Sequence, residues 1–270
     1  MGLRGKTSVA FIVFIFLLSM FSSFLVPYDP NAINLDTLRE SPSFSHPLGT
    51  DNKGRDILAR VLYGAKISIG VSVCAALLSA GTGLFIGLLS GYAGGKMDTF
   101  LMAIVDLILA FPSLLLAIGI SVLFPPGIYT ILIALSSVGW ASFARLIRGY
   151  VLSLRESSFI EAARAIGCSN ARIMIIHILP QCAPLAFVMT GVKLGGYILT
   201  EAALSFLGLG AQPPTATWGS MVSANRAFIS SAPWMVLSPG IMIALSALCF
   251  NLLGDEAREK FDIKRDAQRF

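Results

Sequence analysis

Runs of about 20 apolar residues recur along this chain and limit its possible folds more than any other feature. A helix needs about 20 such residues to cross the roughly 30 Å hydrocarbon core of a bilayer. Six runs meet this length, and each predicts a membrane-spanning helix: Ser8–Val26, Ile67–Gly91, Thr99–Phe124, Ile128–Ile147, Pro184–Phe206 and Trp234–Leu253. The predicted fold class is all-α, a polytopic membrane protein with six transmembrane helices.

The composition supports a membrane protein and excludes a soluble enzyme. Only 13% of the residues are charged and the mean hydropathy is +0.77, whereas soluble domains carry roughly 25% charged residues. The first run could be a secretory signal, because Arg4 and Lys6 precede it. However, its 19 residues exceed a usual signal core and no small-residue cleavage pattern follows. We therefore expect an uncleaved first span.

The positions of the basic residues predict the orientation. When the N-terminus is placed inside, thirteen of the 20 Lys and Arg residues fall on inner segments and six on outer segments, with Lys193 inside a span. Because inner loops are enriched in Lys and Arg, both termini are expected in the cytoplasm. The net charge of +5 is thus explained by the orientation of the chain in the membrane. It does not indicate a nucleic-acid partner, and none is expected.

Cysteine, histidine and glycine patterns give no sign of catalysis or of a resident cofactor. The four cysteines are far apart without a C-x-x-C pair, and only two histidines are present. Gly2, Gly5 and Lys6 do not have the spacing of a phosphate loop, so any ATP must be hydrolysed by another chain. The segment from His46 to Asp56 could hold a metal ion. We instead favour the interpretation that this turn-rich outer segment contacts a binding protein or braces a partner permease.

Charges and glycines inside the apolar runs are candidates for function or packing. Asp106, Lys193 and Glu201 lie in or near spans, where an unpaired charge costs roughly 3 kcal/mol or more. We predict that they line a translocation pathway, with Lys193 about 13 Å into its run. The alternatives are a buried pair of Lys193 with Asp106 and an anchoring role for Glu201. Glycines repeat every four residues over 83–91 and 191–195, which predicts close helix packing, with a hinge as the alternative.

The inner segment between the fourth and fifth runs has the pattern of two short helices. Phe159, Ala162, Ala163 and Ile166 recur at helical spacing, Gly167 can end the first helix, and Ser169 can cap a second that ends at Pro180. An amphipathic helix of this kind either lies in the membrane interface or docks into a groove on a partner.

Within this segment a short motif resembles the EAA signature of permease subunits of bacterial ABC importers. The motif residues are Glu161, Ala162, Ala163, Gly167, Leu179 and Pro180. Other stretches resemble, in the same order, the second (C-type) permease of dipeptide and oligopeptide importers: His46–Asp51, Gly54–Asp56, Ala110–Leu116, Glu201–Gly210, Pro214, Trp218–Gly219, Ala232–Trp234 and Phe250–Asp255. In that family the EAA segment forms a coupling helix that docks on a cytoplasmic ATPase.

The resemblance implies a MetI-like permease fold with a defined domain organisation. The expected parts are an N-terminal transmembrane helix (1–26), an extracytoplasmic loop (27–63), a five-helix core (64–254) containing the coupling loop 148–181, and a cytoplasmic tail (255–270). The chain would sit in the bacterial plasma membrane as a pore-forming subunit and not an enzyme.

The resemblance also implies partners and a mechanism. They are a homologous permease in a heterodimer, two ATPases that bind ATP and Mg, an extracytoplasmic solute-binding protein, and membrane lipid. The expected function is ATP-driven uptake of dipeptides or oligopeptides by alternating access. The alternatives are nickel or other metal chelates, glutathione or another small solute in the same machinery, and an ATP-independent secondary carrier.

Overall fold

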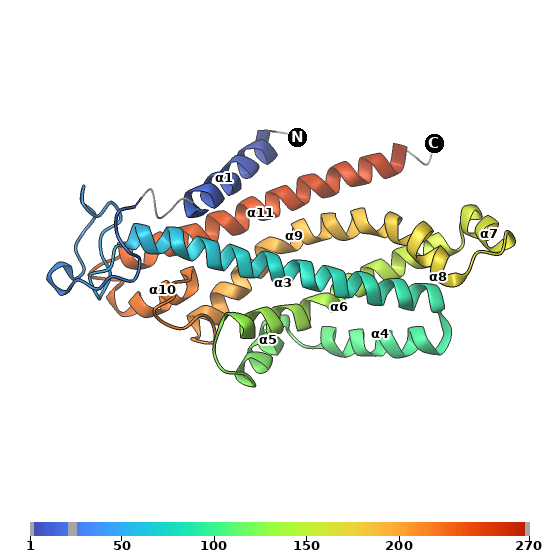
Figure 1. The fold of residues 1–270 in the computed structure, drawn as a ribbon, viewed down its shortest axis with the longest axis horizontal. Helices are drawn as coiled ribbons and strands as arrows, with labels where there is room; N and C mark the ends of the chain where they lie inside the picture. Colours follow the sequence, from blue (N-terminus) through green and yellow to red (C-terminus); the bar gives the residue numbers. More distant parts are fainter. Residues whose placement is uncertain (1–2, 21–25, 268–270) are drawn as a thin grey trace.

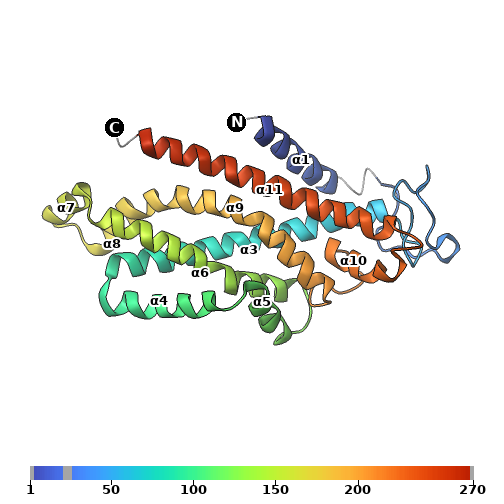
Figure 2. The same ribbon diagram turned by 180° about the vertical axis from the view of Figure 1, so that it is seen from behind.

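The computed structural model describes residues 3–20 and 26–267, and these form a bundle of long helices (Figures 1 and 2). No strand forms within these ranges; the one isolated bridge there joins Thr50 to Asp56. The predicted all-α fold class is confirmed. The helices are α1 (Leu3–Met20), α3 (Ile57–Ala93), α4 (Gly95–Ala110), α5 (Ser113–Val122), α6 (Ile128–Arg155), α7 (Ser158–Ala165), α8 (Asn170–Arg172), α9 (Leu179–Phe206), α10 (Trp218–Asn225) and α11 (Trp234–Ala267).

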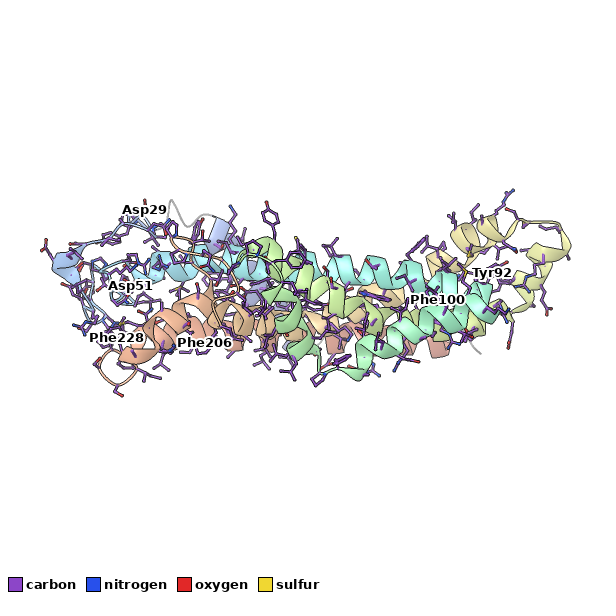
Figure 3. All side chains as sticks on the ribbon, turned by 90° about the horizontal axis from the view of Figure 1, so that it is seen from below. Asp29, Asp51, Tyr92, Phe100, Phe206 and Phe228 are labelled. Atoms are coloured by element: carbon purple, nitrogen blue, oxygen red, sulfur yellow. The ribbon has the colours of Figure 1, made fainter. Side chains whose placement is uncertain are left out.

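Helices α3, α6, α9 and α11 run along the long axis of the bundle (Figure 1). Residues 26–56 gather with α10 at one end, which we call the loop end. Helix α7 stands at the opposite end, which we call the α7 end. Figure 3 shows the same separation, with Asp51 at the loop end and Tyr92 at the α7 end.

Five of the six predicted spans have a counterpart among the candidate membrane-spanning helices of the described residues, if α4 and α5 are taken as one span. Among the described residues, four helices are long and apolar enough to cross a bilayer: Ile57–Ala93, Ile128–Arg155, Asn170–Phe206 and Trp234–Lys260. The pair α4 and α5 passes the same test when taken together. Helix α1 holds 18 residues and packs beside α11 (Figure 2). The end of the first predicted span, at residues 21–25, lies outside the described residues.

The third predicted span is not one helix. Its two parts, α4 and α5, meet at a bend of 93°. Pro112 has no backbone N–H, and its ring pushes the preceding Phe111 into an extended conformation (φ −92°, ψ 144°). The prediction of a continuous helix over Thr99–Phe124 was wrong because a proline lies in the middle of the run.

The prediction that the second helix of the inner segment ends at Pro180 was also wrong. The chain is helical from Asn170 to Phe206, through a π-helical stretch at Ile173–Ile178. In that stretch the Leu179 N–H bonds back to the Met174 carbonyl. The wider turn lets the helix pass Pro180 without an interior clash. The fifth span therefore starts earlier than predicted and ends at Phe206 as predicted.

Three other spans are longer than predicted. Helix α3 begins at Ile57 because the Asp56 carboxylate accepts a hydrogen bond from the Ala59 N–H at 2.7 Å. Helix α6 continues to Arg155 and α11 continues to Ala267, so helix extends into the predicted tail. The starts at Ile128 and Trp234 agree with the prediction.

Glycines bring two pairs of helices into backbone contact, as their four-residue spacing predicts. On α3, a Cβ added at Gly87 would lie 2.6 Å from the Ala144 carbonyl oxygen of α6, and one at Gly91 would lie 2.8 Å from Val151. On α9, a Cβ at Gly195 would lie 2.7 Å from the Ala247 carbonyl oxygen of α11. Real Cβ atoms do not approach so closely, so these positions require glycine. Close packing, and not a hinge, is what the structure shows at these positions.

We predict that Gly87→Ala destabilises the protein and that Gly81→Ala does not. The Cβ at position 87 must displace α6 backbone, at a cost of about 1–3 kcal/mol. Position 81 lies on the same helix with nothing within 4 Å of an added Cβ. The thermal unfolding midpoint of the detergent-solubilised protein measures the difference. Equal midpoints for the two variants would contradict the packing argument.

Candidate functional site: a membrane cavity and the α7 segment

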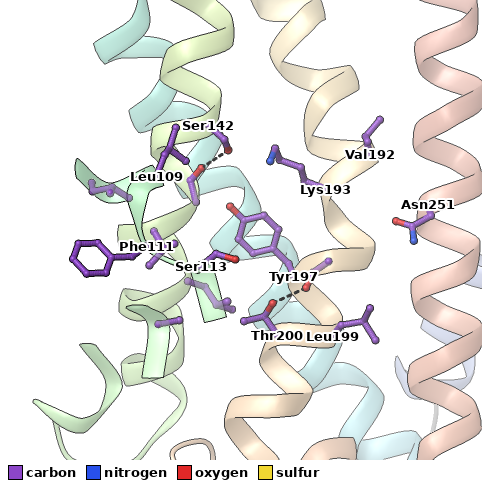
Figure 4. Close-up of a pocket in the computed structure, with 16 residues that line it drawn as sticks. Leu109, Phe111, Ser113, Ser142, Val192, Lys193, Tyr197, Leu199, Thr200 and Asn251 are labelled. Carbon is purple, nitrogen blue, oxygen red and sulfur yellow. Dashed lines mark hydrogen bonds between the residues drawn. The ribbon is translucent and has the colours of Figure 1, made fainter. Parts of the chain in front are cut away.

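A cavity of about 540 Å³ lies beside the break between α4 and α5 (Figure 4). Helices α4, α5, α6, α9 and α11 all contribute to its wall. Its lining is Ile108, Leu109, Phe111, Ser113, Ala117, Leu135, Val138, Gly139, Ser142, Val192, Lys193, Gly196, Tyr197, Leu199, Thr200 and Asn251. The wall is thus mostly apolar, with one cation and a few uncharged polar groups.

Three polar side chains of the cavity come from one face of α9. Lys193, Tyr197 and Thr200 follow one another at helical spacing, and Figure 4 shows Lys193 and Tyr197 directed toward α6. Gly139 of α6 leaves room for the tyrosine, since a Cβ there would collide with the Tyr197 hydroxyl. The spacing from Lys193 could have identified Tyr197 and Thr200 from the sequence, but no sequence signal linked Ser142 or Asn251 to them.

Lys193 is a partly buried cation in this wall. Its Nζ lies 5.8 Å from the centre of the Phe143 ring, a distance suited to a cation–π contact. Among the residues whose side chains the structure describes, no carboxylate forms an ion pair with it. Lys193 is therefore the predicted pathway residue that the structure places on the cavity.

Asp106 and Glu201 do not line this cavity, and their place on a translocation pathway stays a prediction. Asp106 forms an ion pair with Arg145 on α6, and both side chains are more than half exposed. Glu201 is 1% exposed, and its Oε1 accepts a hydrogen bond from the Ser205 hydroxyl at 2.8 Å. The alternative pairing of Lys193 with Asp106 was wrong, because Arg145 lies nearer on the neighbouring helix.

The loop-end side of the cavity is closed by apolar packing. The side chains come from the loop-end halves of α3, α6 and α9, and from α5: Val71, Ala75, Ala76, Ala117, Ile131, Ala134, Leu135, Val138, Tyr197 and Leu204. All of them are buried. Lys193, Ser142 and Asn251 lie on the other side of this cluster, toward the α7 end, as the directions of their helices require.

The α7 segment has the turn that its sequence predicts. Gly167 has φ +83°, and the Cys168 N–H bonds to the Ala163 carbonyl at 3.0 Å, which closes the end of α7. The Ser169 hydroxyl then caps α8 by accepting from the Arg172 N–H. Leu179 and Pro180 open α9. Both the glycine turn and the serine cap are confirmed.

The surface of α7 is divided into an anchored side and an exposed side. Ile160 and Ala163 are buried against the ends of α3, α6 and α9. Glu161, Ala162, Phe159 (43% exposed) and Ile166 (81% exposed) face outward. The predicted apolar face is thus split, since Ala163 anchors the helix while Phe159, Ala162 and Ile166 remain uncovered. An uncovered apolar stripe on a short helix suits either a partner's groove or the membrane interface.

A buried polar network holds the loop end together. The Asp51 carboxylate accepts from Arg55 at 2.7 Å and lies 3.7 Å from the Arg60 Nε. The His46 Nδ1 lies 2.8 Å from the Asp56 carboxylate, which also caps α3. The described residues contain no group of three or more His, Cys, Asp or Glu side chains placed to hold a metal ion. The geometry is that of a rigid, internally bonded segment.

Comparisons with known proteins agree on one family. Residues 83–258 match the family model described as "Binding-protein-dependent transport system inner membrane component". The chain is 41% identical over 261 residues to the glutathione transport system permease protein GsiD of Escherichia coli O6:K15:H31 (strain 536 / UPEC) and of Shigella boydii serotype 4 (strain Sb227). The alignment covers 96% of this chain and 86% of the relative in both cases.

A solved structure shares the fold. It is an inward-facing conformation of the MetNI methionine ABC transporter, with a TM-score of 0.61 and 17% identity. The match covers 75% of this chain and 97% of the other. The MetI-like fold is therefore confirmed.

Two ion pairs join α4 to α6, and they generate a prediction. Asp98 accepts two hydrogen bonds of 2.6 Å from Arg148, and its side chain is only 14% exposed. Asp98→Ala leaves the Arg148 guanidinium without its partner, which we expect to cost roughly 1–3 kcal/mol. Asp106→Ala breaks the exposed pair and should cost less than about 1 kcal/mol. Thermal unfolding of the two variants checks the order; a larger loss for Asp106→Ala would contradict it.

Proposed function

This chain belongs to the family of binding-protein-dependent transport system inner membrane components. We propose that the residues lining its cavity form one side of a solute pathway. The chain is an ABC importer permease of the peptide and glutathione branch. In the proposed mechanism the pathway opens alternately to the two sides of the membrane. The cavity beside Lys193 belongs to the state that opens toward the α7 end.

The observation that carries this proposal is the asymmetry of the cavity. The apolar cluster packs on its loop-end side, while Lys193, Ser142 and Asn251 lie toward the α7 end. A pathway closed at one end is what alternating access requires of one of its two states. The shared fold with a transporter solved in an inward-facing conformation supports the same assignment.

The proposed assembly supplies the parts that this chain lacks. A second, homologous permease completes the pathway, and two ATPases bind ATP and Mg and dock on the exposed stripe of α7. A solute-binding protein delivers its cargo at the loop end, and lipid surrounds the helices. The ATPases shift the permease between states because they bind the two states with different affinity. Hydrolysis belongs to those subunits and not to this pore-forming chain.

We propose a short peptide or glutathione as the solute. The relatives are named for glutathione transport, and glutathione is a tripeptide that carries more carboxylates than amines. A cation in an otherwise uncharged cavity wall suits such a solute. Nickel or other metal chelates and further small solutes are the alternatives within the same machinery.

The test is uptake by the complete complex in proteoliposomes. ATP-driven accumulation of a labelled short peptide or of glutathione should require this chain, the second permease, both ATPases and the binding protein. Omission of the ATPases should abolish accumulation. Accumulation that persists without ATPases, driven by an ion gradient, would overturn the proposal.

A first prediction concerns the turn after α7. Gly167→Val places a β-branched residue at φ +83°, where the strain costs about 1–3 kcal/mol, although the space around it is open. We expect the ATPases to dissociate, or uptake to fall at least tenfold. Gly167→Asn is the matched control, because asparagine tolerates this conformation. Glu161→Lys should also weaken ATPase binding. Copurification of the ATPases and uptake assays measure these effects. Full ATPase retention together with normal uptake in both Gly167→Val and Glu161→Lys would refute the docking assignment.

A second prediction concerns orientation. In a variant without the native cysteines, Ser45→Cys at the loop end should react with a membrane-impermeant thiol reagent in whole cells. Ser158→Cys at the α7 end should react only after the cells are opened. Both side chains are exposed in the structure, so access alone decides the result. Labelling of Ser158→Cys in intact cells would reverse the orientation and remove the site of ATPase docking.

A further inference from the structure

Lys193 is isolated from acidic groups in a way that the transport cycle alone does not explain. None of the cavity-lining residues is acidic. The partner that the sequence suggested, Asp106, is bound to Arg145. The charge faces a ring, a cavity and uncharged polar groups. Water can solvate it there, and a counter-charge would come from dissolved ions, the second permease or the solute.

The surroundings strengthen the effect of this cation on an ion in the cavity. Leu109, Phe111, Val138 and Leu199 form apolar parts of the wall, and a low-dielectric wall concentrates the field of a charge into the aqueous space. Lys193 lies about 20 Å along α9 from its end at Phe206, deep within the span. A cation at this depth disfavours other cations in the cavity and favours anions.

The neighbouring hydroxyl groups complement the cation. The Ser142 hydroxyl donates to the Gly139 carbonyl at 3.0 Å, and the Thr200 hydroxyl donates to the Gly196 carbonyl at 2.9 Å. Their hydrogens are therefore used within the helices, and their oxygen lone pairs remain as acceptors. Both residues line the cavity, where such acceptors suit the N–H groups of a peptide bond.

The spacing of these groups fits a short peptide. Thr200 lies seven residues after Lys193 on α9, about 10 Å along the axis. An extended peptide advances about 3.3–3.6 Å per residue, so three residues span this separation. The cation at one end would meet a carboxylate, and the acceptor at the other would meet amide or amine hydrogens.

We propose that Lys193 is the charge-selecting group of this pathway and that it binds the free carboxylate of a peptide in transit. This inference rests on the proposed function, since it names the solute class for the same cavity. Solutes with a free carboxylate pass faster than otherwise identical amides. Ser142 and Thr200 orient the solute by accepting hydrogen bonds, and the selection adds to that made by the binding protein.

The first experiment measures the field in the cavity without any transported solute. The complete complex without native cysteines carries Thr200→Cys. We measure the rates at which this thiol reacts with an anionic and with a cationic methanethiosulfonate reagent of similar size. We expect Lys193→Gln to lower the ratio of anionic to cationic rates by about tenfold, and Lys193→Arg to keep it. Ser158→Cys on α7 is the matched control, and its ratio should not respond to Lys193→Gln. An unchanged ratio at Thr200→Cys would overturn the inference.

The second experiment measures selection during transport. Proteoliposomes with the complete complex receive a peptide or its C-terminal amide, each at saturating binding protein. Wild type should prefer the carboxylate form, Lys193→Gln should lose that preference, and Lys193→Arg should restore it. An equal loss of uptake for both forms would show a structural role and overturn the inference. Absence of ATP-driven uptake in wild type would instead refute the proposed function, while the thiol ratio still reports the charge selectivity.

Discussion

The contact of helix backbones at glycine positions is the constraint on which the rest of this structure depends. Inside a bilayer the hydrophobic effect does not press helices together, so close packing must supply the attraction. Gly87 and Gly91 bring α3 against α6, and Gly195 with Gly254 brings α9 against α11. These contacts set where the walls of the cavity stand. The polar groups of the site are therefore placed by residues that have no side chain.

The sequence predicted the helices well and their irregularities poorly. Apolar runs of sufficient length specify spans. The predicted starts of the fourth and sixth spans, at Ile128 and Trp234, and the predicted end of the fifth span, at Phe206, agree with the structure. Pro112 breaks its run, whereas Pro180 does not break the next helix, because a π-helical turn precedes it. A proline alone does not say which outcome occurs, since the outcome depends on the backbone before it. Helix α10 was missed because eight residues without a long apolar run give no such signal.

The candidate site likewise has features that the sequence predicts and features that it does not. Gly167 and Ser169 act through local backbone geometry, and local geometry can be predicted from residue type. The partner of Asp106 and the burial of Glu201 depend on how helices pack, which a single sequence does not specify. Lys193 was identified because a charge within an apolar run is unusual, but its actual neighbours, Phe143 and Ser142, lie about 50 residues away in sequence.

The unbroken helix from Asn170 to Phe206 has a mechanical consequence. It joins the α7 segment at one end to the wall of the cavity and the apolar cluster at the other. If it tilts where Gly195 meets α11, the arm toward Asn170 is about 37 Å long and the arm toward Phe206 about 16 Å. A push of about 4 Å at the α7 end would then swing the far end by about 2 Å in the opposite direction. Lys193, about 3 Å from the fulcrum, would barely move. The helix would thus act as a lever. It would transmit displacement from the α7 end to the Phe206 end while Lys193 stays in place.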